Sequence, residues 1–367
     1  MEYFFHRLFL SIVLLSYLSS LEGCDSKPVP SATSPTLVQS SQQQDIRILT
    51  VNVWSGLDYQ GTLQIGHYPD DHQKRYELLL AGIRKLAPDI IAIQEANPAP
   101  QYVKRLAADL GYQVMYHVSL GGIRLGSLGV PKNLREGEAI LVKNAFAIQN
   151  LGVKRLGGFG IATNWLCFHF GEITQALLGK VIINGESFYI YAVHLHSGPF
   201  MGDALDATIS NLARGMPRYK VEEAIRGVQE DITRRRHEIA NLMKFIEDTL
   251  PAGAQAIILG DLNTTVESGE LDPLRRGMWV DSYRLMNPDK EGFTWDSLHN
   301  QNFRPRKLTS QPYDILCANH ERHQARIDFI MVSNNMRHRI IKSEVVLTPW
   351  DGFPTSDHYG VLTTVRK

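Results

Sequence analysis

The chain has 367 residues, of which 44% are hydrophobic and 21% are charged. This length and composition suffice for a sizeable core in one large domain or two smaller ones, and they exclude a fibrous or disordered protein. Lysine plus arginine and aspartate plus glutamate both number 38, so the formal net charge is zero. The chain therefore has no overall positive charge that would indicate nucleic-acid binding. A balanced total still allows a local basic cleft.

Residues 1–23 have the pattern of a signal peptide. An interrupted apolar run follows Arg7 and ends at Leu21, which is too short for a comfortable membrane span. The run ends in Leu21-Glu22-Gly23-Cys24, which resembles the lipobox of bacterial lipoproteins, although Glu22 is unusual there. This resemblance implies lipidation of Cys24, with ordinary secretion as the alternative. Because several acyl chains on one cysteine anchor stably, we expect an extracytoplasmic protein held on a bacterial membrane.

Residues 24–44 are rich in serine, proline, threonine and glutamine, and few of them are apolar. This composition is typical of a solvated tether, so the folded domain is predicted to occupy residues 45–367. Two further cysteines, Cys167 and Cys317, lie in that domain. In an oxidising compartment they could form a disulfide, but two separate buried thiols are equally compatible with the sequence.

The folded part opens with two strand-like segments that each carry a polar side chain near their C-terminal end. These segments are residues 46–53, with Asn52, and residues 89–95, with Glu95. Between them, the apolar spacing over residues 71–86 predicts an amphipathic helix that stops before Pro88. If the strands are parallel neighbours, Asn52 and Glu95 lie at the same sheet edge. Each residue, considered alone, also has a structural interpretation. Asn52 fits a hydrogen-bonded amide in the turn after its strand, and Glu95 fits a cap of the next helix.

Two segments of the next part could border a substrate. After a predicted helix at 101–110 and a strand at 112–118, residues 121–136 are glycine-rich and basic, which is typical of a surface loop with substrate contacts. A strand is predicted at 137–142. Residues 157–178 then combine glycines with Phe159, Trp165, Phe168 and Phe170. We interpret these aromatic residues as ordinary core, with an exposed loop that meets a lipid surface as the alternative.

The middle of the chain predicts a β-hairpin followed by a long helix. Asn184-Gly185 is a strong turn signal between strands at 180–184 and 187–196, and the second strand places His194 and His196 on one face. Residues 199–218 show no strong pattern and are predicted to be a loop. The helix at 219–250 carries an arginine triplet at 234–236, most simply a solvated face and alternatively a landing site for a phosphate-rich partner.

Residues 256–260 are apolar and branched, as in a buried central strand, and Asp261 and Asn263 follow on one face. Side chains that leave such a strand end can hold a water, a phosphate or a hard cation, although a plain turn fits as well. A later strand at 325–332 carries Asp328, and Asp357 and His358 lead into the final strand.

Six short motifs occur in order along the chain: Val51-Asn52-Val53, Ile93-Gln94-Glu95, Val193-His194-Leu195, Gly260-Asp261-Leu262-Asn263, Arg326-Ile327-Asp328-Phe329 and Ser356-Asp357-His358. This series resembles the endonuclease/exonuclease/phosphatase superfamily, which includes deoxyribonuclease-like nucleases, inositol-polyphosphate phosphatases and bacterial neutral sphingomyelinases. The resemblance spans residues 46–366 and implies a deoxyribonuclease-like α/β fold, a two-sheet sandwich flanked by helices. The long interval between His194 and Asp261 implies an insertion beside the cleft.

The resemblance also implies a hard cation, Mg²⁺ with Mn²⁺ as the alternative, since the expected ligands are oxygens. Glu95 would be the principal metal ligand, with Asn52 beside it. Asp357 would lie at the metal or beside the catalytic base.

The remaining motif residues would perform the hydrolysis of a phosphoester. His358, oriented by Asp328, and Asp261 are the two candidates for taking the proton of the attacking water. Asn263 and His194 would hydrogen-bond the phosphate. His196 is the alternate to His194.

Three functions fit this pattern. The leading hypothesis is an extracytoplasmic phosphodiesterase for a phospholipid or sphingolipid headgroup, favoured by the anchor, the aromatic segment and the resemblance of the His194 motif to that of the sphingomyelinases. A nuclease is the runner-up, supported by the basic loop from Arg124 to Arg135 and by the arginine triplet at 234–236, and weakened by the balanced charge. The third is a catalytically silent binding module, which the filled polar positions disfavour. We infer no protein partner.

Overall fold

The computed structural model describes residues 45–58, 63–68, 72–277, 279–306 and 309–367. The predicted signal peptide, Cys24 and the predicted tether lie outside these residues. No helix within the described ranges is both long enough and apolar enough to span a membrane.

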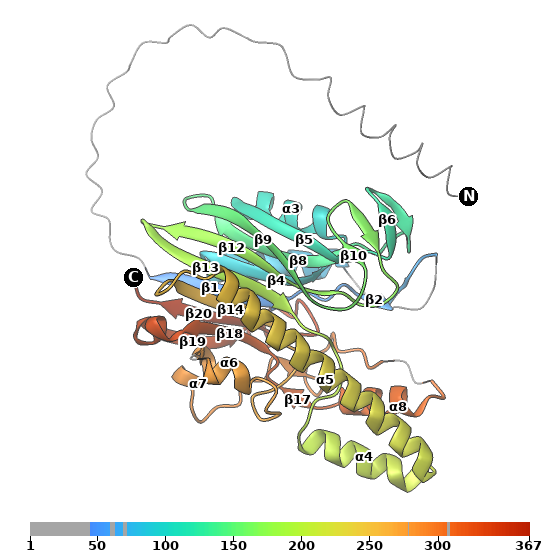
Figure 1. Cartoon of the computed structure of the whole chain (residues 1–367). Helices are drawn as coiled ribbons and strands as arrows, with labels where there is room; N and C mark the ends of the chain where they lie inside the picture. The colour runs from blue at the N-terminus through green and yellow to red at the C-terminus, as the bar shows by residue number, and fades with distance from the viewer. Residues whose placement is uncertain (1–44, 59–62, 69–71, 278, 307–308) are drawn as a thin grey trace, which may run out of the picture. The chain divides into compact units, whose positions relative to one another are not determined.

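Two six-stranded sheets form the centre of the domain (Figure 1). The first has the order β19 (Ile340–Val346), β20 (Gly360–Val365), β1 (Ile46–Asn52), β4 (Ile90–Ala96), β8 (Glu136–Lys143) and β5 (Tyr112–Leu120). The second has the order β15 (Trp279–Asp281), β18 (Asp328–Ser333), β14 (Gln255–Asp261), β13 (Glu186–His194), β12 (Thr174–Ile183) and β9 (Ala147–Gly157). Parallel pairing joins β1 to β4 and β13 to β14, and the other neighbours are antiparallel.

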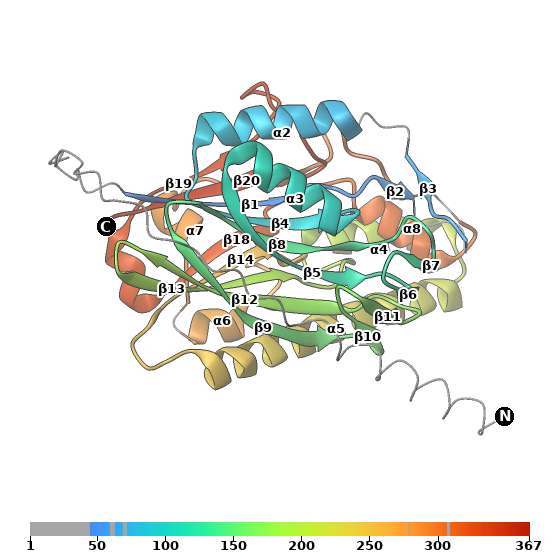
Figure 2. The ribbon, with the colours of Figure 1, turned by 90° about the horizontal axis from the view of Figure 1, so that it is seen from above.

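Helices cover the outer faces of both sheets, as the view in Figure 2 shows. On the first sheet lie α2 (His72–Leu86) and α3 (Ala99–Leu110), and on the second lie α5 (Arg218–Thr249) and α6 (Asp272–Arg276). The remaining helices are α4 (Asp203–Gly215), α7 (Ser282–Met286), α8 (Pro312–His320) and the 3₁₀ helix η1 (Asn334–Arg339). The predicted sandwich flanked by helices is therefore confirmed.

Strand β14 shows why its sequence is continuously apolar. Ile257 and Leu259 belong to the core between the two sheets, whereas Ala256 and Ile258 belong to the core beneath α5. A strand that is buried on both faces needs apolar side chains at every position. The segment β1–α2–β4 is likewise the predicted βαβ step, and Asn52 pairs with Gln94 in its parallel register.

The prediction of a loop at 199–218 is wrong, because α4 occupies most of this segment. Leu205, Ile209 and Leu212 recur at helical spacing and pack with the N-terminal half of α5 and with α8. The long helix itself is confirmed. The hairpin of β12 and β13 is confirmed as well, since Asn184 and Gly185 have φ of 52° and 87°, as a two-residue turn of type I′ requires.

The predicted surface loop at 121–136 is also wrong. It contains β6 (Ile123–Leu125) and β7 (Leu128–Val130), which pair with β10 (Ile161–Ala162) and β11 (Leu166–Phe168) in the order β10-β11-β6-β7. Arg124 is buried, and its guanidinium donates to the carbonyls of Ser127, Pro131 and Lys132. Two ribbons complete the strands, namely β2 (Leu57–Asp58) with β3 (Gly66–His67) and β16 (Trp295–Asp296) with β17 (Gln324–Ala325).

The aromatic residues at 157–178 are not core. Phe159, Trp165, Phe168 and Phe170 are all exposed, which agrees with the alternative interpretation of this segment. Cys167 and Cys317 are both buried free thiols, so the structure contains two separate thiols there and no disulfide between them.

Candidate active site

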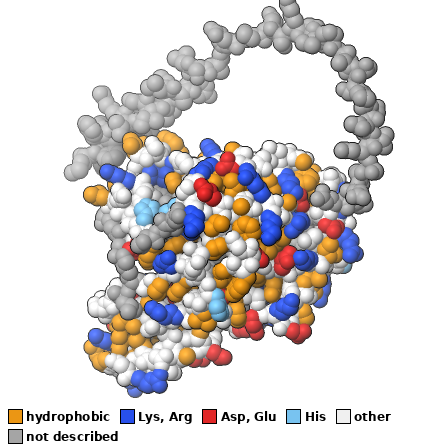
Figure 3. Space-filling view, turned by 180° about the vertical axis from the view of Figure 1, so that it is seen from behind, with side chains coloured by type: hydrophobic (Ala, Val, Ile, Leu, Met, Phe, Trp, Pro, Cys, Tyr) orange, Lys and Arg blue, Asp and Glu red, His pale blue; other side chains and the backbone are white. Residues whose placement is uncertain are grey.

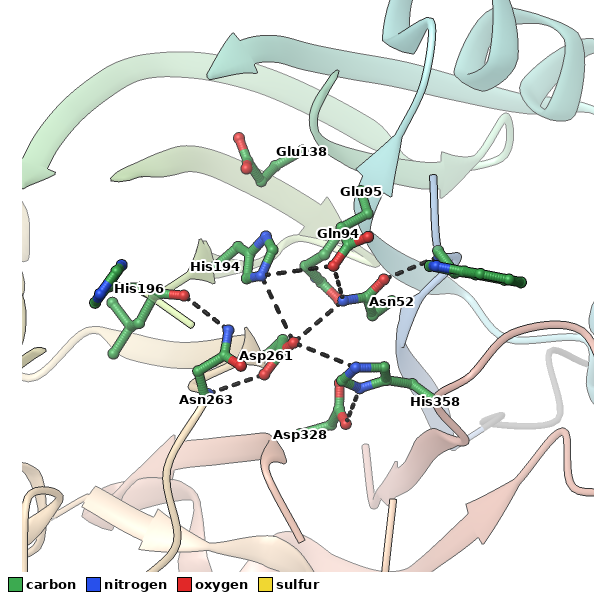
Figure 4. A network of polar contacts seen from close by, with 12 residues as sticks. Asn52, Gln94, Glu95, Glu138, His194, His196, Asp261, Asn263, Asp328 and His358 are labelled. Carbon is green, nitrogen blue, oxygen red and sulfur yellow. Dashed lines mark hydrogen bonds and ion pairs between the residues drawn. The ribbon is translucent and has the colours of Figure 1, made fainter. Parts of the chain in front are cut away.

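Three neighbouring strands of the second sheet bring their polar ends together. His194 on β13 pairs with Asp261 on β14, and Asp261 pairs with Asp328 on β18. Asn52 at the end of β1 and Glu95 on β4 reach the same place from the first sheet (Figure 4). The facing sheets thus gather residues that lie up to hundreds of positions apart in the sequence.

The backbone has unusual conformations at two residues of this edge, Gly260 and Glu95. Gly260 has φ of 145°, and a Cβ there would lie 1.8 Å from the carbonyl oxygen of Val193, so a side chain is excluded. Glu95 has φ of 57°, which a glutamate rarely adopts. Such strained positions cluster at functional sites, because the surrounding structure must hold them in place.

Asp261 is the centre of the cluster and is almost fully buried. Its Oδ2 accepts a hydrogen bond from Asn52 Nδ2 at 3.1 Å and lies 3.6 Å from His194 Nε2 and 3.7 Å from His358 Nε2. Its Oδ1 accepts from the backbone N–H of Asn263 at 2.9 Å. Burial raises the pKa of Asp261 to about 6, although His358 acts in the opposite direction.

His358 and Asp328 form the predicted pair. His358 Nδ1 donates to Asp328 Oδ2 at 2.9 Å, which directs Nε2 toward Asp261. The Trp295 ring packs on the imidazole with centroids 5.0 Å apart, and Thr294 Oγ1 accepts the backbone N–H of Asp328. Burial lowers the pKa of His358, but the carboxylates of Asp328 and Asp261 outweigh it and hold that pKa well above the usual range.

Asn52 and Glu95 are locked to each other. Asn52 Nδ2 donates to Glu95 Oε1 at 2.9 Å, and its Oδ1 accepts the backbone N–H of Trp54 at 2.9 Å, which fixes the orientation of the amide. The backbone N–H of Ser55 donates to Glu95 Oε2 at 3.2 Å. Asn52 thus turns its nitrogen toward the carboxylates of Glu95 and Asp261 and positions both.

Asp357 adds a further carboxylate to the Glu95 side of the cluster. Its Oδ1 accepts from Ser356 Oγ at 3.1 Å. Burial raises the pKa of Asp357 to about 7, while His358 lowers it and the charge of Glu95 raises it further. A carboxylate whose charged form is disfavoured by a neighbouring carboxylate at the edge of a cleft is suited to a bound cation.

Two groups of side chains could hold a divalent cation. Glu95 and Asp357 supply oxygens, which hard cations such as Mg²⁺ prefer. The ligand atoms of Asp261, Asp328 and His358 also lie within 4.8 Å of one another, and Asp328 Oδ1 is buried without a partner among the described residues. His358 contributes a nitrogen where Mg²⁺ prefers oxygen, and its raised pKa keeps the imidazole protonated, so the first group fits the ion better and the second fits an acid–base role.

His194 and Asn263 line the opposite side of Asp261. Burial lowers the pKa of His194, but Asp261 and Glu95 together raise it to about 9. Asn263 Nδ2 donates to the carbonyl of Leu195 at 2.8 Å, which fixes the amide at the cleft margin. Both residues therefore lie beside the carboxylate of Asp261, in the cluster to which the family motifs assigned them.

His196 lies outside this cluster, and its predicted common face with His194 is wrong because β13 ends at His194. Its Nε2 contacts Asp231 Oδ1 at 2.8 Å, and its Nδ1 contacts Glu172. Burial lowers the pKa of His196, but hydrogen bonds to Asp231 and Glu172 raise it to about 9. Local patterns in the sequence could not predict this network, because its members lie on separate elements.

The arginine triplet is mostly not a solvated face. Arg235 is fully buried and forms a bidentate pair with Glu270, at 2.9 and 3.2 Å. Arg234 contacts Glu172 and Glu238. Two of the three side chains are therefore structural, and they do not form a landing site for phosphates.

A cleft of about 740 Å³ opens over the cluster. Its floor includes Glu95, His194, Asp261 and His358. Among the described residues that line it, Arg306 is the only arginine or lysine, and it is paired with Glu321 at 3.1 Å. The walls, which sequence reasoning largely missed, are mainly apolar: Leu120, Ile123, Val130, Pro131, Leu134 and Phe170, and opposite them Pro199, Phe200, Ala325 and Ile327.

Comparisons with known proteins agree with this geometry. Residues 49–358 match the Endonuclease/Exonuclease/phosphatase family. TDP2 from Caenorhabditis elegans is 16% identical, with 88% of this chain and 75% of that chain covered and a TM-score of 0.53. An endonuclease/exonuclease/phosphatase family protein from Bacteroides thetaiotaomicron is 16% identical, with 88% and 98% covered and a TM-score of 0.54.

A mannosyl-6-phosphatase from Bacteroides thetaiotaomicron is also 16% identical, with 87% and 99% covered and a TM-score of 0.52. No curated protein matches the chain. At these identities the structural likenesses establish the fold, whereas the sequence match over most of the chain establishes the family. The chain therefore belongs to the endonuclease/exonuclease/phosphatase family and is a hydrolase of phosphoester bonds.

Proposed function

We propose that this protein is a Mg²⁺-dependent phosphodiesterase that acts outside the cytoplasm on the headgroup of a phospholipid or sphingolipid. The observation that supports this substrate class is the chemistry of the cleft walls. They are mainly apolar, and among the described residues their one arginine is neutralised by Glu321. A cleft of this kind suits one phosphodiester with an apolar substituent better than a polyanion.

In the proposed reaction, Asp261 orients the attacking water and accepts its proton. The water oxygen bonds to phosphorus while the bond from phosphorus to the leaving oxygen breaks, and the leaving oxygen takes up a proton and departs as the alcohol. The Oδ2 of Asp261 is the point on which Asn52, His194 and His358 converge, so this oxygen is the best-positioned acceptor in the cluster. His358, held by Asp328, then donates from Nε2 to a phosphoryl oxygen. His194 and Asn263 contact the phosphate from the other side and stabilise the charge that develops there.

Glu95 and Asp357 would hold the metal ion, and Asn52 would keep Glu95 oriented through its amide nitrogen. When bound, the ion would neutralise charge on the phosphoryl oxygens. Both side chains are partly exposed toward the cleft, and the charge of Glu95 raises the pKa of Asp357, which supports this assignment.

A nuclease remains the second candidate function. One of the similar structures is a Danio rerio TDP2 that is complexed with a single-stranded DNA product, at 15% identity and a TM-score of 0.51. That likeness supports the fold alone. The predicted basic surface, however, is reduced, because Arg124 and Arg235 are buried in hydrogen-bond networks and Arg234 is paired with Glu172.

A single assay separates the two. The purified protein would be given Mg²⁺ and either sphingomyelin, phosphatidylcholine, phosphoinositides, single-stranded DNA or duplex DNA, and the release of water-soluble product would be measured. We expect hydrolysis of at least one lipid, no comparable cleavage of DNA, and loss of turnover in Asp261→Asn. Cleavage of DNA alone would overturn the lipid assignment.

The location is proposed from the sequence of residues 1–24. Its signal-peptide pattern and Cys24 support export and lipid anchoring, with secretion as the alternative. A lipid substrate and a membrane-held enzyme are mutually consistent, because anchoring confines the enzyme to the surface that carries its substrate.

A further inference from the structure

The small sheet of β6, β7, β10 and β11 presents an apolar face to solvent. Side chains alternate along each strand, so that Arg124, Ala162 and Cys167 are buried. The residues between them point outward and are all apolar, with Leu128 reaching 80% exposure. The exposed members on the strands are Ile123, Leu125, Leu128, Val130, Ile161, Leu166 and Phe168.

An ordinary surface sheet carries polar side chains on its solvent face, whereas the exposed side chains on these strands are all apolar. The face is also continuous, because Ile161 pairs with Phe168, Phe168 with Ile123, and Ile123 with Val130 across adjacent strands. The flanking loops add Phe159, Trp165 and Phe170, which are 90%, 62% and 85% exposed. A contiguous apolar surface of this extent marks an interaction site.

Exposed hydrophobic side chains are concentrated here. Ten of the 18 large hydrophobic residues that are exposed in the described chain belong to this sheet and its loops. In Figure 3, which shows one face of the molecule, hydrophobic side chains reach the surface at the upper left, at the end of the domain where β6 lies in Figure 1, as well as elsewhere. We call these ten residues the apolar face.

The exposed charged side chains of residues 121–171, the stretch that carries the apolar face, are basic, and the next carboxylate, that of Glu172, is paired with Arg234. Residues 121–171 contain two acidic side chains, Glu136 and Glu138, and both are buried. Lys132, Lys154 and Arg155 in the same stretch are exposed. Basic side chains beside an apolar surface attract anionic lipid headgroups, whereas a protein partner would need no such bias.

The apolar face also continues into the cleft. Ile123, Val130 and Phe170 belong to both, so a surface on which this face docks would meet the mouth of the cleft directly. We propose that the apolar face docks on a lipid bilayer, with its aromatic side chains at the level of the headgroups. This inference adds a membrane-docking surface to the proposed function. It rests on that function only for the identity of the substrate.

The chain length before the domain permits this orientation. In Figures 1 and 2, β1 begins at the end of the sheets remote from β6. A domain of this size is roughly 50 Å across, whereas residues 25–44, when extended, span up to about 70 Å. Lipidation at Cys24 and docking of the apolar face are therefore compatible in one molecule.

Two exposed tryptophans provide a matched test. Trp165 lies in the apolar face, whereas Trp350 is 69% exposed on another loop and packs on Tyr359. The full chain would be reconstituted with vesicles of brominated phosphatidylcholine and phosphatidylglycerol, since bromine in the acyl chains quenches tryptophan fluorescence on contact. We expect quenching in the wild type, loss of most of it in Trp165→Phe, and retention in Trp350→Phe.

Equal effects of the two substitutions, or no quenching, would overturn the proposal. So would protection of Trp165 by a second copy of the chain, which sedimentation would reveal as a dimer. Because fluorescence needs no turnover, it stays informative even if the assigned substrate is wrong.

A second pair of variants connects docking with activity. Leu128→Asn should lower the rate of lipid hydrolysis on vesicles about tenfold, because one leucine side chain that the bilayer would bury is lost from the contact. Hydrolysis of a monomeric short-chain lipid should be unchanged, since Leu128 does not line the cleft. Leu298→Asn, which alters a leucine that is 67% exposed elsewhere, should change neither rate. Equal losses on both substrates would show that Leu128 acts through the fold.

Discussion

At the scale of single residues, the Asp328–His358 pair determines how the imidazole meets the substrate. Asp328 is fully buried, and its hydrogen bond to Nδ1 fixes both the tautomer and the direction of Nε2. We expect Asp328→Asn to preserve the shape of the site and to lower kcat by about 10²-fold to 10⁴-fold, because the imidazole of His358 would lose the carboxylate that fixes its tautomer and its direction. Steady-state kinetics with a soluble phosphodiester would measure it.

A second aspartate–histidine pair supplies the control. Asp296 is also buried and lies 3.0 Å from His299, but it caps a turn and does not touch His358. Asp296→Asn should leave kcat close to the wild-type value. If both substitutions lowered kcat equally, the effect of Asp328 would be a general loss of structure in this region.

At the scale of elements, helix α5 is held to the cleft by Arg235. The guanidinium pairs with Glu270 and donates to the carbonyls of Gly198 and Pro199, on the loop that follows β13. We expect Arg235→Met to destabilise the protein by about 3–5 kcal/mol, because Glu270 would be left as an uncompensated buried charge. The free energy of unfolding in urea would measure the loss.

Arg236 is the natural control for that substitution. It is the next residue of the same helix and is exposed, so Arg236→Met should change the free energy of unfolding by less than about 0.5 kcal/mol. Similar losses for the two variants would mean that helix propensity, rather than the buried ion pair, accounts for the effect.

The same helix shows what periodicity in a sequence can and cannot reveal. The apolar spacing over 219–250 sufficed to predict α5, because helix formation depends on neighbours three and four residues away. The burial of Arg235 depends on Glu270, which is 35 residues distant, so it is invisible to local patterns. The small sheet was missed for a related reason, since each of its strands has only two or three residues.

At the scale of the whole molecule, the active site exists only because two sheets face each other. The run before Asp261 indicated a buried strand end, but nothing local placed it beside Asn52, which lies 209 positions away. The order of six motifs supplied that information through the family resemblance. The cleft walls could not be predicted, because they come from Phe170, Phe200 and Ile327, whose surroundings depend on how separate elements pack.

This assembly also links the stability of the whole domain to its cation. Glu95, Asp357, Asp261 and Asp328 crowd one end of the sandwich, and a bound ion would reduce their repulsion. We expect Mg²⁺ at about 100 times its Kd to stabilise the folded state by about 2.7 kcal/mol, which corresponds to a rise in Tm of about 3–5 °C. Thermal unfolding with EDTA and with Mg²⁺ would measure the shift.

Glu95→Gln should remove most of this response, because it deletes a charged ligand while preserving the size of the side chain. The response is measured against the Tm of the same variant in EDTA, because Glu95→Gln also removes an acceptor of Asn52 and Ser55 and the charge beside His194. Glu138→Gln alters a buried carboxylate that contacts Ser119 and does not line the cleft, so its response to Mg²⁺ should be retained. A full Mg²⁺ response in Glu95→Gln would place the ion on the alternative group, Asp261, Asp328 and His358, and would reverse the assignment of metal ligands and acid–base residues made here.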